Sequence, residues 1–201
     1  HDAQIDDARH TVAVARTAAA HGAAIATRTA VVSLIREDGR VVGAVIRDEL
    51  TGREFETRAR VVLGAAGVWT DDLLEMSGSS SQHAVRQSKG IHLVVPREAF
   101  PSTSALIART PTSVLFLLPW GRHWLIGTTD TDYTGSRSEP QVDEADVDYL
   151  LAEANKWLAR PLTRDDVVGI YSGLRPLLSA GTGEDGTATL SREHAVLRPA
   201  P

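Results

Sequence analysis

A lysine and a histidine stand at the start of one apolar run. Residues 88–96 read Ser-Lys-Gly-Ile-His-Leu-Val-Val-Pro, which places Lys89 and His92 at the beginning of a predicted strand. An imidazole in that position can act as a general base on an alcohol. A histidine that only hydrogen-bonds a loop carbonyl fits the same pattern, and on the residues alone it is the better interpretation.

Hydroxyl and carboxylate side chains follow a second apolar run. Residues 127–133 read Gly-Thr-Thr-Asp-Thr-Asp-Tyr. They predict either the polar wall of a pocket or a turn in which Thr129 and Asp130 hydrogen-bond local backbone, and the spacing does not decide between them. The glycine and the distal glutamate of a calcium loop are missing, and the chain has no cysteine, so we expect no metal site.

A single arginine interrupts a third apolar run. Residues 171–177 read Tyr-Ser-Gly-Leu-Arg-Pro-Leu. Burying the guanidinium of Arg175 is unfavourable unless it meets an anion. Its geometry matches a phosphate or a carboxylate through two parallel hydrogen bonds. The anion is therefore either a bound ligand or an internal carboxylate, and the sequence favours neither.

The first part of the chain predicts a helix followed by a meander of strands. Residues 6–21 have helical spacing of apolar side chains, with acidic residues at the start and Gly22 at the end. Residues 23–27 predict a short strand. The meander rests on a Glu-Asp-Gly-Arg turn at 37–40, which is a strong hairpin signal. Its three antiparallel strands are expected at residues 31–36, 41–47 and 54–59.

An apolar run without alternation comes next, at residues 60–70. It predicts a strand buried on both faces, as in a parallel sheet. The run ends in Ala66 and Gly67, whose small size lets a ligand approach the backbone. A helix is expected at 71–76 and a surface loop at 77–82.

The rest of the chain predicts an antiparallel sheet with one flanking helix. The helix is residues 143–158, with an apolar stripe. The strands are expected at residues 90–95, 104–107, 113–119, 124–127 and 167–174, and a glycine-rich loop at 181–186. The predicted fold class is α+β or α/β, with an α/β layer and its inserted meander at 1–76 and an antiparallel sheet with its flanking helix at 85–198.

Composition limits the class of protein. The chain has 201 residues, 42% hydrophobic and 23% charged, which is ordinary for a globular protein. The net charge of −5 argues against non-specific binding to nucleic acid or anionic lipid. No apolar run approaches the roughly 20 residues of a membrane span, and there is no signal-peptide pattern. We expect a cytoplasmic protein, and the missing initiator methionine indicates a fragment.

Taken together, these segments resemble the FAD-dependent glycerol-3-phosphate dehydrogenases. Several motifs match that family in chain order, over nearly the whole sequence. They are residues 6–9 (Asp-Asp-Ala-Arg), 65–69 (Ala-Ala-Gly-Val-Trp), 89–96 (Lys-Gly-Ile-His-Leu-Val-Val-Pro), 119–120 (Pro-Trp), 126–130 (Ile-Gly-Thr-Thr-Asp), 162–167 (Leu-Thr-Arg-Asp-Asp-Val) and 172–177 (Ser-Gly-Leu-Arg-Pro-Leu).

The resemblance implies a reaction and a location. The family oxidises sn-glycerol 3-phosphate to dihydroxyacetone phosphate by hydride transfer to FAD, and electrons continue to a quinone. It implies that Arg175 anchors the substrate and that His92 is the base for the C2 hydroxyl. A peripheral position on the cytoplasmic membrane face and a homo-oligomer are also implied.

The resemblance implies that residues 1–76 are a partial FAD-binding domain and that residues 85–198 are a mixed or antiparallel substrate-binding domain. It further assigns contacts with the cofactor and the substrate. Val31 is expected on the adenosine side of FAD, and Ala66 and Gly67 on the flavin side. Lys89 and Thr128 are expected near the substrate.

Some features of the family are absent, which keeps other functions open. The chain lacks the family's Gly-x-Gly-x-x-Gly turn and its C-terminal Gly-Gly-Lys segment, and residue 66 is alanine where threonine is usual. We expect the isolated chain not to retain FAD and to be inactive. The alternatives are a fragment of a related amine or amino-acid oxidase and a non-catalytic module that binds a small anion.

Overall fold

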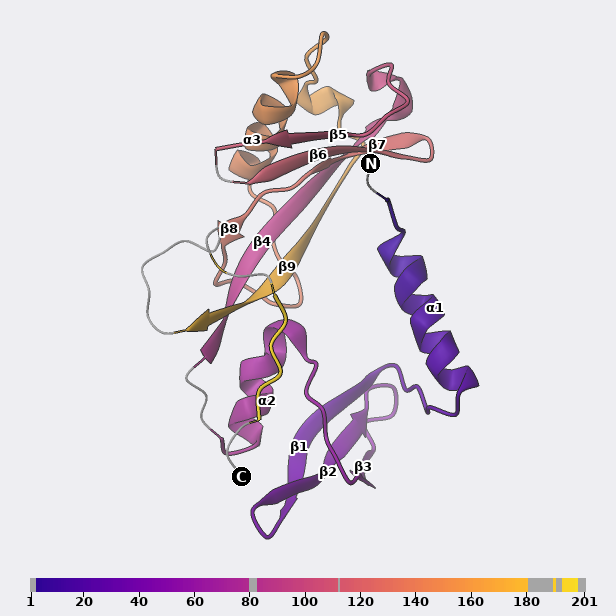
Figure 1. The fold of residues 1–201 in the computed structure, drawn as a ribbon, viewed down its shortest axis with the longest axis vertical. Coiled ribbons are helices and arrows are strands. Elements are labelled where there is room, and N and C mark those ends of the chain that lie inside the picture. Colours follow the sequence, from indigo (N-terminus) through magenta and orange to yellow (C-terminus); the bar gives the residue numbers. More distant parts are fainter. Residues whose placement is uncertain (1–2, 80–82, 112, 181–189, 191–192, 199–201) are drawn as a thin grey trace. The chain divides into compact units, whose positions relative to one another are not determined.

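The protein was analysed as a computed structural model, which describes residues 3–79, 83–111, 113–180, 190 and 193–198. The chain forms two compact units, His1–Leu63 and Gly64–Ala200 (Figure 1). The boundary between the two compact units follows Leu63, whereas the predicted first domain ends at residue 76. The assignment of residues 1–76 to the cofactor and 85–198 to the substrate concerns function and stays a prediction.

The first unit begins with helix α1 (Asp7–Ala20), which confirms the predicted helix. The side chain of Asp6 caps its start by accepting a hydrogen bond of 3.0 Å from the backbone N–H of Arg9. Gly22 follows its end with a φ of 93°, a left-handed conformation that glycine adopts without penalty. The predicted strand at 23–27 is wrong: these residues are exposed and pair with no described strand.

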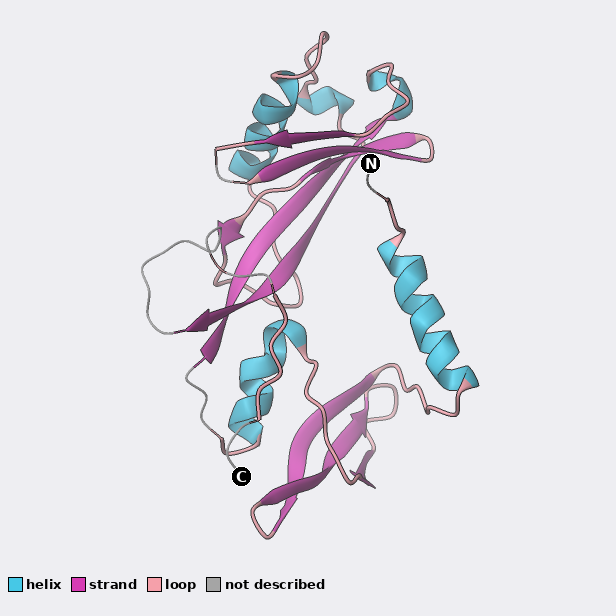
Figure 2. Ribbon diagram, viewed as in Figure 1, coloured by secondary structure: helices cyan, strands magenta, loops and turns pink. Residues whose placement is uncertain are grey.

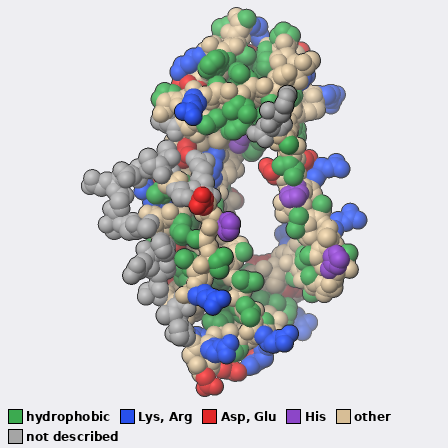
Figure 3. Space-filling model, in the orientation of Figure 1, with side chains coloured by type: hydrophobic (Ala, Val, Ile, Leu, Met, Phe, Trp, Pro, Cys, Tyr) green, Lys and Arg blue, Asp and Glu red, His purple; other side chains and the backbone are tan. Residues whose placement is uncertain are grey.

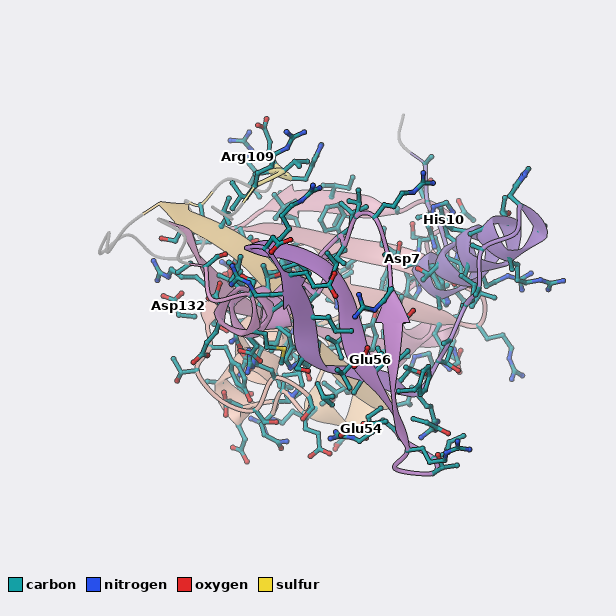
Figure 4. The ribbon with its side chains drawn as sticks, turned by 90° about the horizontal axis from the view of Figure 1, so that it is seen from below. Asp7, His10, Glu54, Glu56, Arg109 and Asp132 are labelled. Atoms are coloured by element: carbon teal, nitrogen blue, oxygen red, sulfur yellow. The ribbon has the colours of Figure 1, made fainter. Side chains whose placement is uncertain are left out.

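The predicted meander is confirmed as an antiparallel sheet of β1 (Thr29–Glu37), β2 (Arg40–Asp48) and β3 (Glu54–Arg58), shown in Figure 2. Asp38 and Gly39, with φ of 48° and 77°, supply the two positive φ angles that the tight β1–β2 turn needs. Acidic and basic side chains lie together at the tip of this hairpin, at the bottom of Figure 3. Figure 4 shows the side chains of Glu54 and Glu56 projecting from β3.

The predicted strand at 60–70 is wrong. Val61 and Leu63 are 71% and 85% exposed, and no described strand pairs with the segment. A strand buried on both faces needs paired neighbours, and its apolar side chains stay in solvent when none is present. The segment continues into the short helical turn η1 (Gly67–Trp69) and the predicted helix, which is confirmed as α2 (Thr70–Met76).

The second unit is built on a six-stranded antiparallel sheet. The strand order is β5-β6-β7-β4-β8, and β9 pairs with β4 on its other side. The strands are β4 (His83–Pro96), β5 (Leu106–Arg109), β6 (Val114–Trp120), β7 (His123–Gly127), β8 (Thr131–Asp132) and β9 (Gly169–Ala180). Two helical turns, η2 (Arg97–Ala99) and η3 (Arg164–Asp166), join its elements.

The predicted strands of this unit are confirmed, with shifted ends. The strand expected at 90–95 is the longer β4, the one expected at 104–107 lies two residues later, and β9 runs on to Ala180. The predicted loop at 181–186 lies outside the described residues, as does the end of the loop at 77–82. In the described part of the chain, no helix is long and apolar enough to cross a membrane.

Helix α3 (Glu144–Asn155) covers one face of the sheet, and the core lies between them. Asp143 and Asp146 form a capping box at its start, which confirms the predicted helix with a shorter C-terminal end. Ile91 and Leu93 of β4 and Leu150 of α3 are fully buried in this core. Each such side chain contributes about 1.5–3 kcal/mol by leaving water. The packing fixes which face of β4 points away from α3.

Candidate functional site

Pairing of β4 with β9 and β7 brings the predicted site residues onto one face of the sheet. Ser88 lies opposite Arg175, and His92 lies opposite Tyr171. Because alternate residues of a strand share a face, these four side chains point to the same side, away from the α3 core. Thr128 follows β7 and meets Arg175 on this side. We call Ser88, His92, Thr128, Tyr171 and Arg175 the site face.

Arg175 is held by hydrogen bonds to the segment that follows β7. Its Nη2 donates to Thr128 Oγ1 at 2.9 Å, and its Nη1 donates to the carbonyl oxygen of Thr129 at 3.2 Å. Ser88 Oγ lies 3.5 Å from Nη1 and donates to the carboxylate of Asp130. This segment therefore forms a polar wall against Arg175, one of the two arrangements that its residues predict.

His92 is half-buried beside Tyr171. The two rings are stacked, with their centroids 4.9 Å apart and their planes 7° from parallel. Burial, and then the positive charge of Arg175, hold the pKa of His92 below its ordinary value. The imidazole is therefore neutral near pH 7, and one ring nitrogen can accept a proton.

The guanidinium of Arg175 reaches back toward His92. A methyl group at Gly90 would lie 2.5 Å from Nη2 and 2.7 Å from Nη1 of Arg175, so the guanidinium lies over Gly90. Gly90 is two residues before His92 in β4, which corresponds to about 7 Å along the strand. A cation and a neutral imidazole thus lie on the same face of the sheet.

Lys89 points to the opposite side of the sheet. Its Nζ lies 2.5 Å from Asp143 and 2.7 Å from Asp146 at the start of α3, and 5.6 Å from the ring of Tyr133. Burial alone would lower the pKa of Lys89, but the hydrogen bonds that Lys89 donates to the two aspartates outweigh it and raise the pKa. Strand alternation places Lys89 and His92 on opposite faces, so the structure does not bring these two side chains together, and the place of Lys89 near the substrate stays a prediction.

Ala66 and Gly67 adjoin the strand that carries Arg175. Gly67 has a φ of 57°, and a methyl group on it would lie 4.0 Å from Cγ of Pro176, the residue after Arg175. Both residues are half-buried. Val31 lies in β1 of the other unit and is 42% exposed.

Several residues of this site are missed by the sequence reasoning. Ser88, Gly90, Gly127 and Tyr171 lie in the quoted motifs but are assigned no role there. Their contribution depends on cross-strand register, which the local pattern does not specify. In the described ranges, no group of three His, Asp or Glu side chains could hold a metal ion.

Comparison with known proteins decides the family. A sequence model described as "FAD dependent oxidoreductase" matches residues 1–196. The chain belongs to this family. The predicted resemblance was to the FAD-dependent glycerol-3-phosphate dehydrogenases, and it is confirmed at the level of this wider family.

Relatives within the FAD dependent oxidoreductases include glycerol-3-phosphate dehydrogenases. Glycerol-3-phosphate dehydrogenase 2 of Mycobacterium tuberculosis is 51% identical over 200 residues, which are 100% of this chain and 34% of the relative. The crystal structure of the Bacillus halodurans glycerol-3-phosphate dehydrogenase complexed with FAD is 38% identical, with a TM-score of 0.83 over 88% of this chain and 36% of that chain. The chain spans about a third of the length of these relatives.

The fold is shared more widely. Glycine oxidase from Bacillus cereus superposes with a TM-score of 0.64 over 84% of this chain and 43% of that chain, at 22% identity. At that identity the likeness shows the fold alone. The α+β fold class is confirmed by these superpositions.

Proposed function

We propose that the protein carrying this chain oxidises sn-glycerol 3-phosphate to dihydroxyacetone phosphate, with FAD as the hydride acceptor. The proposal rests on one observation: Arg175 and a neutral His92 lie on the same face of the sheet. One group suits an anion and the other suits an alcohol proton, and the substrate has both. The 51% identity to a glycerol-3-phosphate dehydrogenase supports the same substrate.

Arg175 binds the negative end of the substrate in this proposal. Its guanidinium is oriented by Thr128 and the carbonyl oxygen of Thr129, which are neutral acceptors. They fix the direction of the guanidinium, which can meet a phosphate through paired hydrogen bonds. Thr128 thus lies beside the anion, in agreement with its expected place near the substrate.

His92 accepts the proton of the C2 hydroxyl at a ring nitrogen. The pKa of His92 is below its ordinary value, so the base is ready at neutral pH. FAD, when bound, supplies the acceptor for the hydride that leaves C2. The substrate then loses one proton to His92 and one hydride to the cofactor, which balances its conversion from alcohol to ketone.

The residues present fit the flavin end of the cofactor. The turn at Ala66 and Gly67 has no bulky side chain and adjoins β9 next to Arg175, so a flat ring system can approach its backbone. In the proposal, this turn contacts the flavin and Val31 contacts the adenosine side. The electrons pass to a quinone, with the protein peripheral on the cytoplasmic membrane face and assembled as a homo-oligomer.

The test is an anaerobic titration of the flavin absorbance of the full-length protein. We expect glycerol 3-phosphate to bleach the flavin, and glycerol, which lacks the phosphate, to bleach it far less at equal concentration. Bleaching by glycine in place of glycerol 3-phosphate would contradict the proposal and favour an amine or amino-acid oxidase. A full-length protein purified without flavin would favour the anion-binding module.

The isolated chain gives a second comparison. We expect the purified 201-residue chain to be colourless and inactive, because the pyrophosphate-binding turn is absent from its sequence. A yellow chain that oxidises glycerol 3-phosphate would show that the described residues suffice for both binding and catalysis.

A further inference from the structure

Two glycines lie directly beneath the two functional side chains. Gly127 of β7 is the cross-strand partner of His92, and a methyl group on it would lie 2.8 Å from Cγ and Nε2 of the imidazole. Gly90 of β4 is not the cross-strand partner of Arg175, but the guanidinium lies over it, and Nη2 would be 2.5 Å from such a methyl group. Both distances are shorter than carbon atoms tolerate, so neither position can carry a side chain while its neighbour keeps its place.

The two functional side chains are held in different ways. Arg175 is fixed by hydrogen bonds to Thr128 and Thr129, and a methyl group at Gly90 would also lie 2.6 Å from Thr128 Oγ1. The ring of His92 makes no hydrogen bond with any residue that the structure describes. Its orientation therefore depends on packing: Tyr171 stacks beside it, and Gly127 leaves the space into which it leans.

We propose that Gly90 and Gly127 are positioning residues, which hold the Arg175 guanidinium and the His92 imidazole flat against the sheet in the orientation that meets the substrate. Preorganisation of this kind raises the rate because the groups need no rearrangement when the substrate binds. The role in substrate binding rests on the proposed function. The close contact of Gly90 with Arg175 and of Gly127 with His92 is independent of that function.

The chain offers a matched control in Gly173. It lies in β9 directly opposite Gly90, and a methyl group on it would meet nothing within 4 Å. Gly90, Gly127 and Gly173 all have φ angles outside the left-handed region, so alanine fits the backbone at each position. The three glycine-to-alanine substitutions therefore differ mainly in the space around the added methyl group.

The first experiment measures stability in the full-length protein and does not depend on the reaction. We expect Gly127→Ala to lower the midpoint of urea unfolding and Gly173→Ala to leave it unchanged. Combining Gly127→Ala with His92→Ala removes the imidazole that the methyl group would strike, so the loss caused by Gly127→Ala should largely disappear in that background. An equal loss with and without His92, or a Gly127→Ala variant as stable as Gly173→Ala, would overturn the proposal.

The second experiment separates the two glycines by their effects on turnover. Gly127→Ala displaces the base, so kcat with glycerol 3-phosphate should fall at least tenfold while KM changes little. Gly90→Ala displaces the anion-binding guanidinium, so KM should rise at least tenfold. Equal effects of both variants on both constants would show a general structural role and contradict the assignment. If the protein does not oxidise glycerol 3-phosphate at all, the stability coupling still tests the positioning itself.

Discussion

Nη2 of Arg175 donates a hydrogen bond of 2.9 Å to Oγ1 of Thr128, across a sequence separation of 47 residues. The contact joins strand β9 to the segment that follows β7, although β9 and β7 are not paired with each other. It turns the guanidinium back over β4, toward His92. The anion site is thus assembled from two motifs that are far apart in the sequence, and each half needs the other for its geometry.

Removing the guanidinium should remove the affinity for the phosphate. We expect Arg175→Ala to lower kcat/KM for glycerol 3-phosphate by at least about 100-fold, because it removes two hydrogen bonds to a charged group and each contributes about 1.5–3 kcal/mol. Arg175→Lys should recover only part of this loss, since an ammonium cannot make the planar paired contacts. Steady-state kinetics of the full-length protein measure both. Arg109→Ala, an exposed arginine of β5, is the matched control. Unchanged kinetics in Arg175→Ala would exclude the assigned role.

His92 should give the reaction a dependence on acid pH. Burial and the charge of Arg175 lower the pKa of His92, and the described groups against it are Arg175 and Tyr171 of β9. The base must be neutral to act, so kcat/KM should hold at neutral pH and fall as the pH drops through a value below the ordinary histidine pKa of about 6.5. His92→Asn should lower the rate by about 10²–10⁴-fold and abolish this acid limb. A variant that keeps the limb, or that loses only affinity, would assign the proton transfer to another group.

Local chemistry predicts much of this fold. The Asp38-Gly39 turn and the capping of α1 and α3 are each encoded in a few adjacent residues, and these elements lie where the sequence places them. The segment at 60–70 shows the limit. Its apolar run has strand propensity, but a strand exists only where another backbone pairs with it, and pairing is not a local property.

The site is predictable in its residue types and not in its geometry. Arg175 and His92 are candidates because each is a polar residue in an apolar run, and the resemblance to the glycerol-3-phosphate dehydrogenases assigns their roles. Lys89 is unusual in the same way, yet it belongs to the opposite face, because one residue of displacement reverses the direction of a strand side chain. Gly90 and Gly127 are recognised only from the space they leave, which depends on the cross-strand register.

The ion pair of Lys89 with α3 should be one of the larger single contributions to stability in the second unit. The side chains of Lys89 and Asp146 are 3% and 7% exposed, and their charged atoms are 2.7 Å apart. Replacing Lys89 by methionine keeps the volume but leaves the Asp146 carboxylate buried without its cation. Breaking a buried pair in this way costs about 3–5 kcal/mol. Urea unfolding of the full-length protein measures the change.

Two further variants separate the charge from the packing. Asn at position 146 can still accept the capping hydrogen bond from the backbone of Asp143 but carries no charge, so adding Asp146→Asn to Lys89→Met should restore part of the lost stability. Arg164→Ala removes an exposed pair with Asp148 and should cost at most about 1 kcal/mol. The pKa of Lys89 is raised in the folded protein. The ion pair therefore contributes fully to the free energy of unfolding below the ordinary lysine pKa of about 10.4, and this contribution is lost as the pH rises through the raised pKa. If Lys89→Met unfolds at the same urea concentration as Arg164→Ala, the carboxylate is reached by water and the pair does not support the fold.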